Sequence, residues 1–344
     1  MLTAKENFLE TIKGGNPDRF VNQYEAFHFL SHPYTMRSGG FLLPGQMNVK
    51  NAWGVLNSYP VHAPAPFPEH TPDKVLIKDI EDWKEYVKAP SLKFTEYEWE
   101  SFMEAAEAVD SKNAFKTVAV APGLFEQTHH MCSMTEALVN YITNPDEMHD
   151  LISYLKDWEL ELAETVCSHL HPDHIHHHDD WGSEISTFLK PDMFAEYFLE
   201  PYKEIYKYYH DHGVQVITHH SDSYAATLVP YMIEMGIDVW QGTMKSNDIG
   251  SLIEKYGGKI SFMGGIDNKQ VDFEGWTRED CRKAAVNACE TYGRKFYIPC
   301  ITQGMPGSMY PGAYETLLEE IDKYNEERFG IKGADKVRAP LRIF

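Results

Sequence analysis

Short apolar runs alternate with amphipathic helical segments along almost the whole sequence, and no linker or change of composition interrupts them. Residues 214–230, VQVITHHSDSYAATLVP, show the unit: a run rich in β-branched residues, a polar cluster and a helical pattern. This order is typical of a buried parallel strand followed by a loop and a helix. The carboxyl end of such a strand reaches the ligand face, so this polar cluster is a candidate for metal ligation or proton transfer; an ordinary loop is the alternative.

The repeated unit predicts the fold class. Strands are predicted at 19–29, 115–122, 173–178, 214–218, 237–241, 259–263 and 295–300, and helices at 3–14, 80–88, 96–109, 134–141, 145–170, 191–212, 224–235, 249–256, 277–292 and 311–328. Such alternation is typical of parallel βαβ units, and about eight strands fit the chain. No GxGxxG fingerprint opens the first unit, which favours a closed (β/α)8 TIM barrel over a doubly wound sheet. We expect a single α/β domain, residues 1–344, with an N-terminal helix and a long 30–75 loop.

The predicted loop at 30–75 is rich in glycine, proline and aromatic residues and has little periodicity. A loop of this length in a compact protein is usually functional, which predicts a lid or a substrate wall. Trp53, Tyr59, His62 and Phe67 are candidates to line that wall. Filling a small satellite core is the alternative role for the same side chains.

Composition excludes several classes of partner. The 31 basic and 52 acidic residues give a formal charge of -21, which repels nucleic acid and anionic membranes. The acidic surface keeps the protein in solution or, alternatively, binds a basic patch on another protein.

No apolar run is long enough to span a membrane, and the charged N-terminus lacks a signal-peptide core, so we expect a cytoplasmic protein. The five cysteines form no CxxC pair and predict no disulfide framework.

Polar residues at the predicted strand ends form the candidate site, because in a barrel these ends meet on one face. They are Asp179, Asp180, Trp181, His219, Ser221, Asp222, Gln241, Asp267 and Cys300. The imidazole of His219 and the thiolate of Cys300, completed by a carboxylate, would make a three-ligand zinc site with one open position, the arrangement of a catalytic zinc. Because side chains alternate along a strand, His219 and Ser221 face one way and His220 the other. In DHIHHH the same alternation places His176 and His178 on one side and His177 on the other, so the three cannot bind one ion.

The remaining candidates are assigned by their place near these strand ends. Asp180, His220 and Asp222 are the predicted catalytic residues. The predicted substrate-binding residues are Trp181, Glu184, Tyr224, Trp240 and Gln241. Capping of the following turn is an equally good interpretation of Asp180 and Glu184.

The chain resembles the uroporphyrinogen decarboxylase superfamily over nearly its whole length. The resemblance is carried by GGNPDRF after the opening helix, DDWG before KPDMFAEYFLEPYKEI, then ITHHSD and GGID. It implies a (β/α)8 barrel with its site at the C-terminal face. True uroporphyrinogen decarboxylases have an MRQAGRY-type arginine motif, of which PYTMRSGG retains only Met36 and Arg37. The chain is therefore more similar to the branch of corrinoid-dependent methyltransferases and O-demethylases.

That branch binds zinc through a His-x-Cys pair and a late cysteine. His219 matches the histidine and Cys300 the late cysteine, whereas Ser221 replaces the middle cysteine. Serine is a poor zinc ligand, so either Asp222, Asp180 or another group completes the metal site or zinc has been lost. The loss of a thiolate would make the site harder, which suits an oxygen leaving group.

The resemblance implies transfer of a methyl group from a small donor to a corrinoid protein, with zinc as Lewis acid and cobalamin carried by the partner. The aromatic loop 41–67 would hold a methoxylated aromatic or similar donor. The corrinoid protein would dock over the 30–75 and 301–312 loops, and an oligomer is compatible with the sequence. A metal-independent decarboxylase or lyase acting on a small carboxylated substrate is the alternative function.

Overall fold

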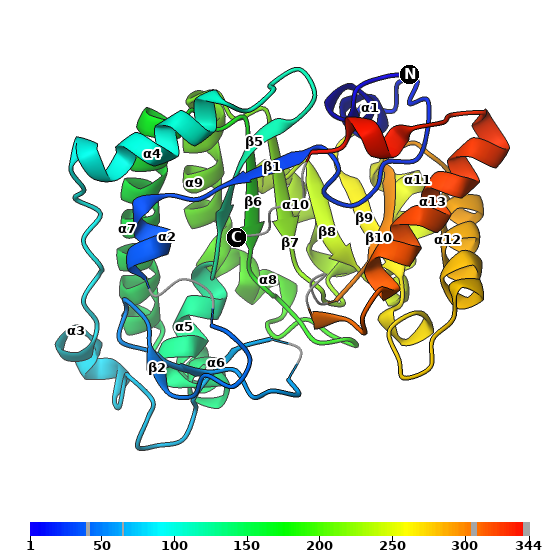
Figure 1. Cartoon of the computed structure of the whole chain (residues 1–344). Coiled ribbons are helices and arrows are strands. Elements are labelled where there is room, and N and C mark those ends of the chain that lie inside the picture. Colours follow the sequence, from blue (N-terminus) through cyan, green and yellow to red (C-terminus); the bar gives the residue numbers. More distant parts are fainter. Residues whose placement is uncertain (39–41, 64, 304–307, 340–344) are drawn as a thin grey trace.

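The main sheet consists of seven parallel strands in the order β1-β5-β6-β7-β8-β9-β10 (Figure 1). The computed structural model describes residues 1–38, 42–63, 65–303 and 308–339. The strands of this sheet are β1 (Phe27–Leu30), β5 (Phe115–Val120), β6 (His174–His178), β7 (Val216–His220), β8 (Val239–Thr243), β9 (Ser261–Ile266) and β10 (Tyr297–Ile301). The predicted alternation of parallel strands with helices is confirmed.

The sheet curls around an apolar interior. Phe27 of β1, Val216 of β7 and Ile298 of β10 belong to one buried cluster, although their strands lie far apart in the sheet order. Helix α1 (Ala4–Ile12) contributes Phe8 to the same cluster. The described residues thus form a TIM-like half-barrel, in which β1 and β10 are the end strands, and the predicted eighth strand is not among them.

Helices cover the outside of the curled sheet (Figure 1). A large second cluster of buried residues joins them to the sheet, with Tyr202 and Tyr206 among its members. The remaining α-helices are α2 (Pro33–Arg37), α3 (Trp83–Tyr86), α4 (Glu96–Glu107), α5 (Leu124–Cys132), α6 (Met134–Thr143), α7 (Pro145–Leu170), α8 (Pro191–Phe194), α9 (Glu200–Asp211), α10 (Val229–Met235), α11 (Ile249–Tyr256), α12 (Arg278–Tyr292) and α13 (Ala313–Phe329). A π-helical turn at Ala195–Leu199 joins α8 to α9.

The segment predicted as the 30–75 loop contains regular structure. Helix α2 is followed by a three-stranded antiparallel sheet of β2 (Val49–Lys50), β3 (Leu56–Ser58) and β4 (Phe67–Pro68). Trp53 is buried with its ring 4.9 Å from that of Trp158 on α7, so it fills the core rather than lining a wall. His62 and Phe67 are exposed. Parts of PYTMRSGG, of the predicted aromatic loop 41–67 and of the predicted docking loop 301–312 lie outside the described residues.

Two predicted elements begin later than expected because tertiary hydrogen bonds replace local ones. The predicted strand at 19–29 starts only at Phe27, since the Phe20 N–H donates to the side chain of Asn325 at 2.8 Å. The helix predicted at 224–235 starts at Val229, since the Asn247 side chain accepts from the N–H groups of Ala225 and Ala226. The opposite case is α5, a helix that the sequence prediction left out.

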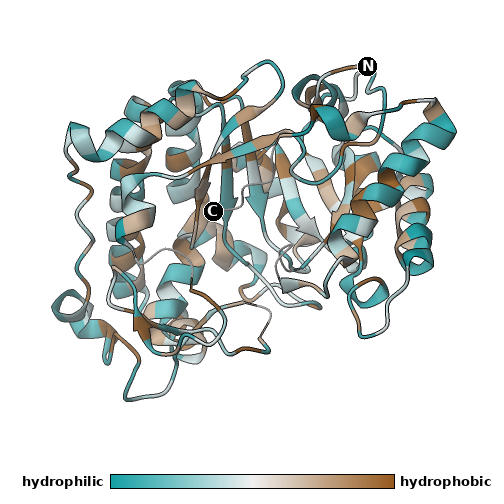
Figure 2. Cartoon of the chain, viewed as in Figure 1, coloured by the Kyte–Doolittle hydropathy of each residue, from teal (hydrophilic) through white to brown (hydrophobic). Residues whose placement is uncertain are grey.

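Strand β6 is the hydrophilic member of the sheet, as its teal colour in Figure 2 shows. Four of its five residues are histidines, and His174 and His177 are fully buried. A histidine-rich strand in a buried sheet needs hydrogen-bond partners or ligands on both of its faces.

In the described parts of the chain, no helix has both the length and the apolar character that crossing a bilayer requires.

Candidate functional site

Strands β6 and β7 pair in a register that sorts their histidines by face. His177 lies beside His219, and His178 lies beside His220. Because successive side chains point to opposite faces of a sheet, each of these pairs shares one face. His178 and His220 stack with ring centroids 4.4 Å apart, and His177 and His219 stack at 5.4 Å. The predicted separation of His177 from His178 and of His219 from His220 is confirmed.

The interior face carries Glu126, His178, Asp180, His220 and Asp222, which we term the inner group. His178 Nδ1 lies 2.8 Å from Glu126 Oε2. Because a carboxylate accepts, His178 donates through Nδ1 and its Nε2 is left for a ligand. Asp180 Oδ1 accepts from the Asp222 N–H at 3.0 Å and lies 3.8 Å from His220 Nε2.

Gln241 of β8 orients the ring of His220. Its Oε1 accepts from His220 Nδ1, which leaves the lone pair of His220 on Nε2, the atom that faces Asp180. The adjacent Gly242 has a φ of +89° at a register shift between β8 and β9. A side chain there would meet the backbone of Ser221 and Asp222 at about 3 Å, so glycine permits this close approach. Gln241 therefore acts on the inner group through His220.

Burial and neighbouring carboxylates set the charges of the inner group. Burial lowers the pKa of His220 to about 4, so the ring is neutral at pH 7. Burial also lowers the pKa of His178, but Glu126 and Asp180 outweigh it, and the net shift is upward. Burial and then the charge of Asp180 raise the pKa of Asp222 to about 8. This upward shift favours the protonated carboxyl of Asp222 in the metal-free site, the form that is able to donate a proton.

Three side chains of the inner group have the arrangement of a metal site. His178, Asp180 and His220 each offer one ligand atom, and these atoms lie within 4.8 Å of one another. Two imidazoles and one carboxylate are a known catalytic zinc ligand set that leaves a coordination position open. Glu126 beside His178 and Gln241 beside His220 supply the partners that orient metal-bound histidines. These residues therefore fit a zinc ion.

The opposite face carries His177, Asp179, Trp181 and His219, which we term the outer group. His219 Nε2 donates to the carbonyl oxygen of Asp179 at 3.1 Å, and the hydroxyl of Tyr206 on α9 lies 2.8 Å from Nδ1. Trp181 stacks on the His219 ring with centroids 3.9 Å apart. Both nitrogens of His219 are therefore occupied by protein groups, and burial lowers its pKa well below the usual range.

Asp179 is the hydrogen-bond centre of the outer group. Its carboxylate accepts from the N–H groups of Phe125 and Glu126 at 3.0 and 2.7 Å, from Trp181 Nε1 at 2.9 Å, and from the Tyr202 hydroxyl. This carboxylate thereby holds the first turn of α5, which carries Glu126, against the end of β6. The outer group fixes the position of the inner group.

The predicted metal ligands His219 and Cys300 are not brought together. Cys300 belongs to the apolar interior cluster and donates to the carbonyl of Ile301 at 3.0 Å. Burial raises the pKa of its thiol far above the usual range, whereas a hydrogen bond with Gln241 opposes that shift. His219 packs instead on the helix side, against Tyr206 and Trp181. Zinc itself remains a prediction.

Some of the other predicted residues lie in or beside the inner group, and the rest are buried in the core or lie at the surface. Asp180, His220, Asp222 and Gln241 are brought together. The predicted substrate-binding Trp181 and Trp240 are fully buried, and Trp240 Nε1 donates to the Ser221 carbonyl at 2.9 Å. Ser221 Oγ accepts from the Trp181 N–H at 3.1 Å. Glu184 forms an exposed ion pair with Lys269, Tyr224 is half-buried after β7, and Asp267 caps the turn after β9.

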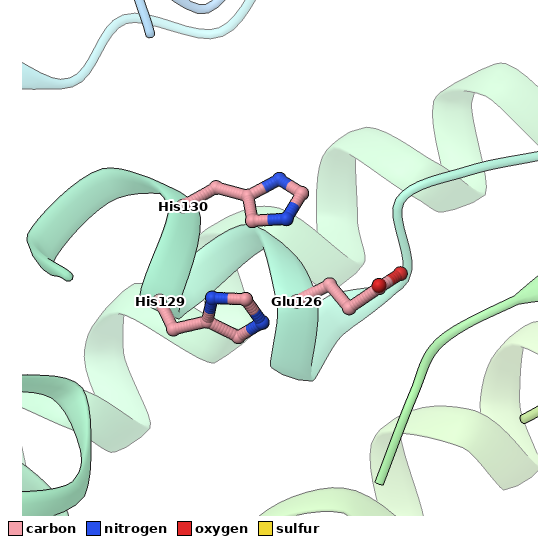
Figure 3. Close-up of side chains that lie close together, drawn as sticks. All are labelled: Glu126, His129 and His130. Carbon is pink, nitrogen blue, oxygen red and sulfur yellow. The ribbon is translucent and has the colours of Figure 1, made fainter. Parts of the chain in front are cut away.

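Sequence reasoning did not assign Glu126, His129 and His130 of α5 or His178 to the site. The first three lie on one helix, at spacings of three and four residues, and Figure 3 shows their side chains close together. The signal was present, because GLFEQTHH directly follows a predicted strand, the position from which the other candidates were chosen.

Comparison with known proteins supports the resemblance. Residues 68–324 match the family model described as Uroporphyrinogen decarboxylase (URO-D). A solved methyltransferase from Methanosarcina mazei superposes with a TM-score of 0.62 at 12% sequence identity, over 94% of this chain and 99% of that one. At this identity the likeness concerns the fold. No curated protein sequence matches significantly.

Proposed function

We propose that this chain, which belongs to the uroporphyrinogen decarboxylase family, is an enzyme that transfers a methyl group from a small donor to a corrinoid protein. The observation that carries the proposal is the set of His178, Asp180 and His220, whose ligand atoms lie within 4.8 Å of one another. One solved structure with a similar fold is a methyltransferase, which supports this reaction class. A methoxylated aromatic is the donor type that we expect.

His178 Nε2, His220 Nε2 and a carboxylate oxygen of Asp180 would hold zinc. When bound, zinc would supply Lewis acidity to the ether oxygen of the donor. Glu126 and Gln241 keep the two imidazole rings in the required orientation. In this proposal the third ligand is Asp180, and Cys300 is a buried thiol of the interior.

Asp222 is the proposed proton donor. In the transfer the methyl carbon–oxygen bond breaks and a carbon–cobalt bond forms on the cobalt(I) corrinoid of the partner. The oxygen keeps the bonding electron pair and needs a proton to become a stable alcohol or phenol. We assign this proton to Asp222 because burial and the charge of Asp180 raise its pKa to about 8 in the metal-free site.

The corrinoid protein would dock on the segment between α2 and β4. This segment carries exposed large apolar side chains, namely Met36, Leu43, Met47, Val61 and Phe67. His70, which follows β4, has its ring 6.1 Å from that of His129 on α5, the helix that also carries Glu126 of the inner group. Leu43→Asp with Val61→Asp should therefore weaken transfer to the corrinoid protein and spare transfer to free cob(I)alamin.

Decarboxylation is the alternative. It needs cationic groups for the substrate's carboxylates, and Arg37, which the resemblance offers, forms an ion pair with Glu98 at 2.5 Å and 49% side-chain exposure. The inner group instead contains three carboxyl groups, those of Glu126, Asp180 and Asp222, and no arginine or lysine. This difference favours methyl transfer.

The test is methylcobalamin formation from cob(I)alamin and a panel of methoxylated aromatics, under anaerobic conditions with and without zinc. His220→Ala should abolish zinc-dependent transfer, whereas His212→Ala, which changes the exposed histidine that follows α9, should leave it unchanged. Chelation should stop transfer by the wild type. Turnover that persists after chelation and in His220→Ala would contradict the proposal, and release of carbon dioxide from carboxylated substrates would favour the alternative.

A further inference from the structure

Helix α5 presents a second group of metal-ligating side chains beside the inner group. Glu126, His129 and His130 each offer a ligand atom, and these atoms lie within 4.8 Å of one another. Spacings of three and four residues place side chains on the same helix face. Figure 3 shows both imidazole rings beside the Glu126 carboxylate.

We propose that Glu126, His129 and His130 bind a second metal ion, beside the first position, whose ligand His178 contacts Glu126. Two imidazole nitrogens and one carboxylate oxygen suit borderline divalent ions such as zinc and cobalt(II). Glu126 uses Oε2 for His178, and its other carboxylate oxygen takes no part in that contact. Glu126 would thus be a ligand of the second ion and the hydrogen-bond partner of a ligand of the first.

An unpartnered ring atom supports this assignment. His129 is only 9% exposed, and its Nδ1 has no hydrogen-bond partner among the described residues. A buried polar atom without a partner costs about 1–3 kcal/mol in ordinary proteins, so such atoms call for a ligand or water. His219 is the contrasting case, because protein groups occupy both of its nitrogens.

The surroundings of His129 and His130 also favour a cation. Both lie in the last turn of α5, where the partial negative charge of the helix end attracts cations. The His129 and His130 rings lie at 4.7 Å with an interplanar angle of 87°, and the His70 ring approaches His129 edge-on at 6.1 Å. Three imidazole rings therefore lie near this end of the helix, and Glu126 lies about one turn before them on the same face.

Two adjacent metal ions extend the chemistry available to the proposed methyl transfer. In two-metal sites the ions lie about 3.5–4 Å apart and stabilise the attacking and leaving groups of one displacement. The inference rests on the proposed function for the first position, but the three ligands of the second position lie on α5 and are not ligands of the first. The two positions are therefore distinguishable by mutation.

The experiment measures metal stoichiometry on the full chain after chelator treatment and equilibrium dialysis against zinc. Wild type and the exposed-surface control His212→Ala should each retain about two zinc ions per chain. The variant His129→Ala with His130→Ala should retain one, and so should His178→Ala with His220→Ala. Thermal unfolding of each metal-free variant confirms that it is folded, and cobalt(II) absorption in the folded variants reports each remaining site separately.

The outcomes separate this inference from the proposed function. One ion that is lost only in the His178/His220 variant overturns the second site and leaves the first intact. One ion that is lost only in the His129/His130 variant supports the α5 site and contradicts the zinc site of the proposed function. A single ion that is lost in both variants, or no bound ion at all, overturns the proposal of two separate metal positions.

Discussion

Adjacent residues on β7 differ in what their surroundings leave free. His219 faces the helices, where the Asp179 carbonyl and the Tyr206 hydroxyl occupy both ring nitrogens. His220 faces the interior, where Gln241 takes Nδ1 and Nε2 is 3.8 Å from Asp180. The comparison separates a histidine that stabilises the fold from one that is free to bind a ligand. Residue type alone does not make this distinction, because it depends on which nitrogens are already hydrogen-bonded.

The same division extends along both strands. His177 of the outer group pairs with Glu159 on α7 at 2.8 Å, whereas His178 of the inner group meets Glu126 near the proposed metal. The outer group is buried among the tyrosines of α9 and forms the rigid support that a preorganised site requires. Substitutions in the outer group should lower stability, and those in the inner group should lower activity.

Asp179→Ala should have the largest effect. It removes the acceptor of two α5 N–H groups, of Trp181 Nε1 and of the Tyr202 hydroxyl. Losing one member of a buried charged network lowers the free energy of unfolding by about 3–5 kcal/mol. Urea unfolding measures this, with the exposed Asp211→Ala as control. A loss below about 1 kcal/mol would show that the outer group does not support the site.

Asp222→Asn should affect the reaction and leave the fold intact. The amide retains the shape of the side chain but has no acidic proton, so methyl transfer should fall by about 100-fold or more. Zinc content should stay at the wild-type level. The measurement is the rate of methylcobalamin formation with donors of different leaving-group pKa, because donors with acidic phenols need less proton transfer. An equal fall for all donors would argue against Asp222 as the acid.

His219→Ala should cost about 2–3 kcal/mol of unfolding free energy, since it removes a buried ring and leaves two polar partners unpaired. His220→Ala removes one hydrogen bond, to Gln241, and should cost less. Chemical denaturation of both metal-free variants gives the difference directly. Equal losses would remove the distinction between the two faces.

The smallest effect concerns pH and His174, at the start of β6. Its ring lies between Thr117 Oγ1 at 3.0 Å and Thr218 Oγ1 at 2.9 Å, and burial lowers its pKa to about 3. In the unfolded chain the His174 ring binds a proton near pH 6.5, whereas in the folded chain it stays neutral down to about pH 3. Its contribution to the free energy of unfolding is therefore complete above pH 6.5 and is lost progressively as pH falls towards 3. One group contributes about 1 kcal/mol between pH 6.5 and 5.5. His174→Gln should flatten the pH dependence of urea unfolding by that amount, and an unchanged slope would contradict this.

The sequence predicted the alternation of parallel strands with helices, because apolar runs and helical periodicity are local signals. It also predicted that His219 and His220 face opposite ways. It did not predict which of them faces the interior, since that depends on strand register and on tyrosines of α9 far along the chain. The three strands within 30–75 and helix α5 were missed because they are short and their stability comes from tertiary contacts such as Asp179 with α5.

The most direct measurement compares zinc affinity of His219→Ala and His220→Ala, for the full chain at a temperature where both variants are folded. Isothermal titration after chelation should show that His219→Ala keeps the first-site affinity within a few fold, while His220→Ala loses at least about 10–100-fold. The opposite result, with tight binding lost in His219→Ala and kept in His220→Ala, would contradict the assignment of the inner group as the metal site.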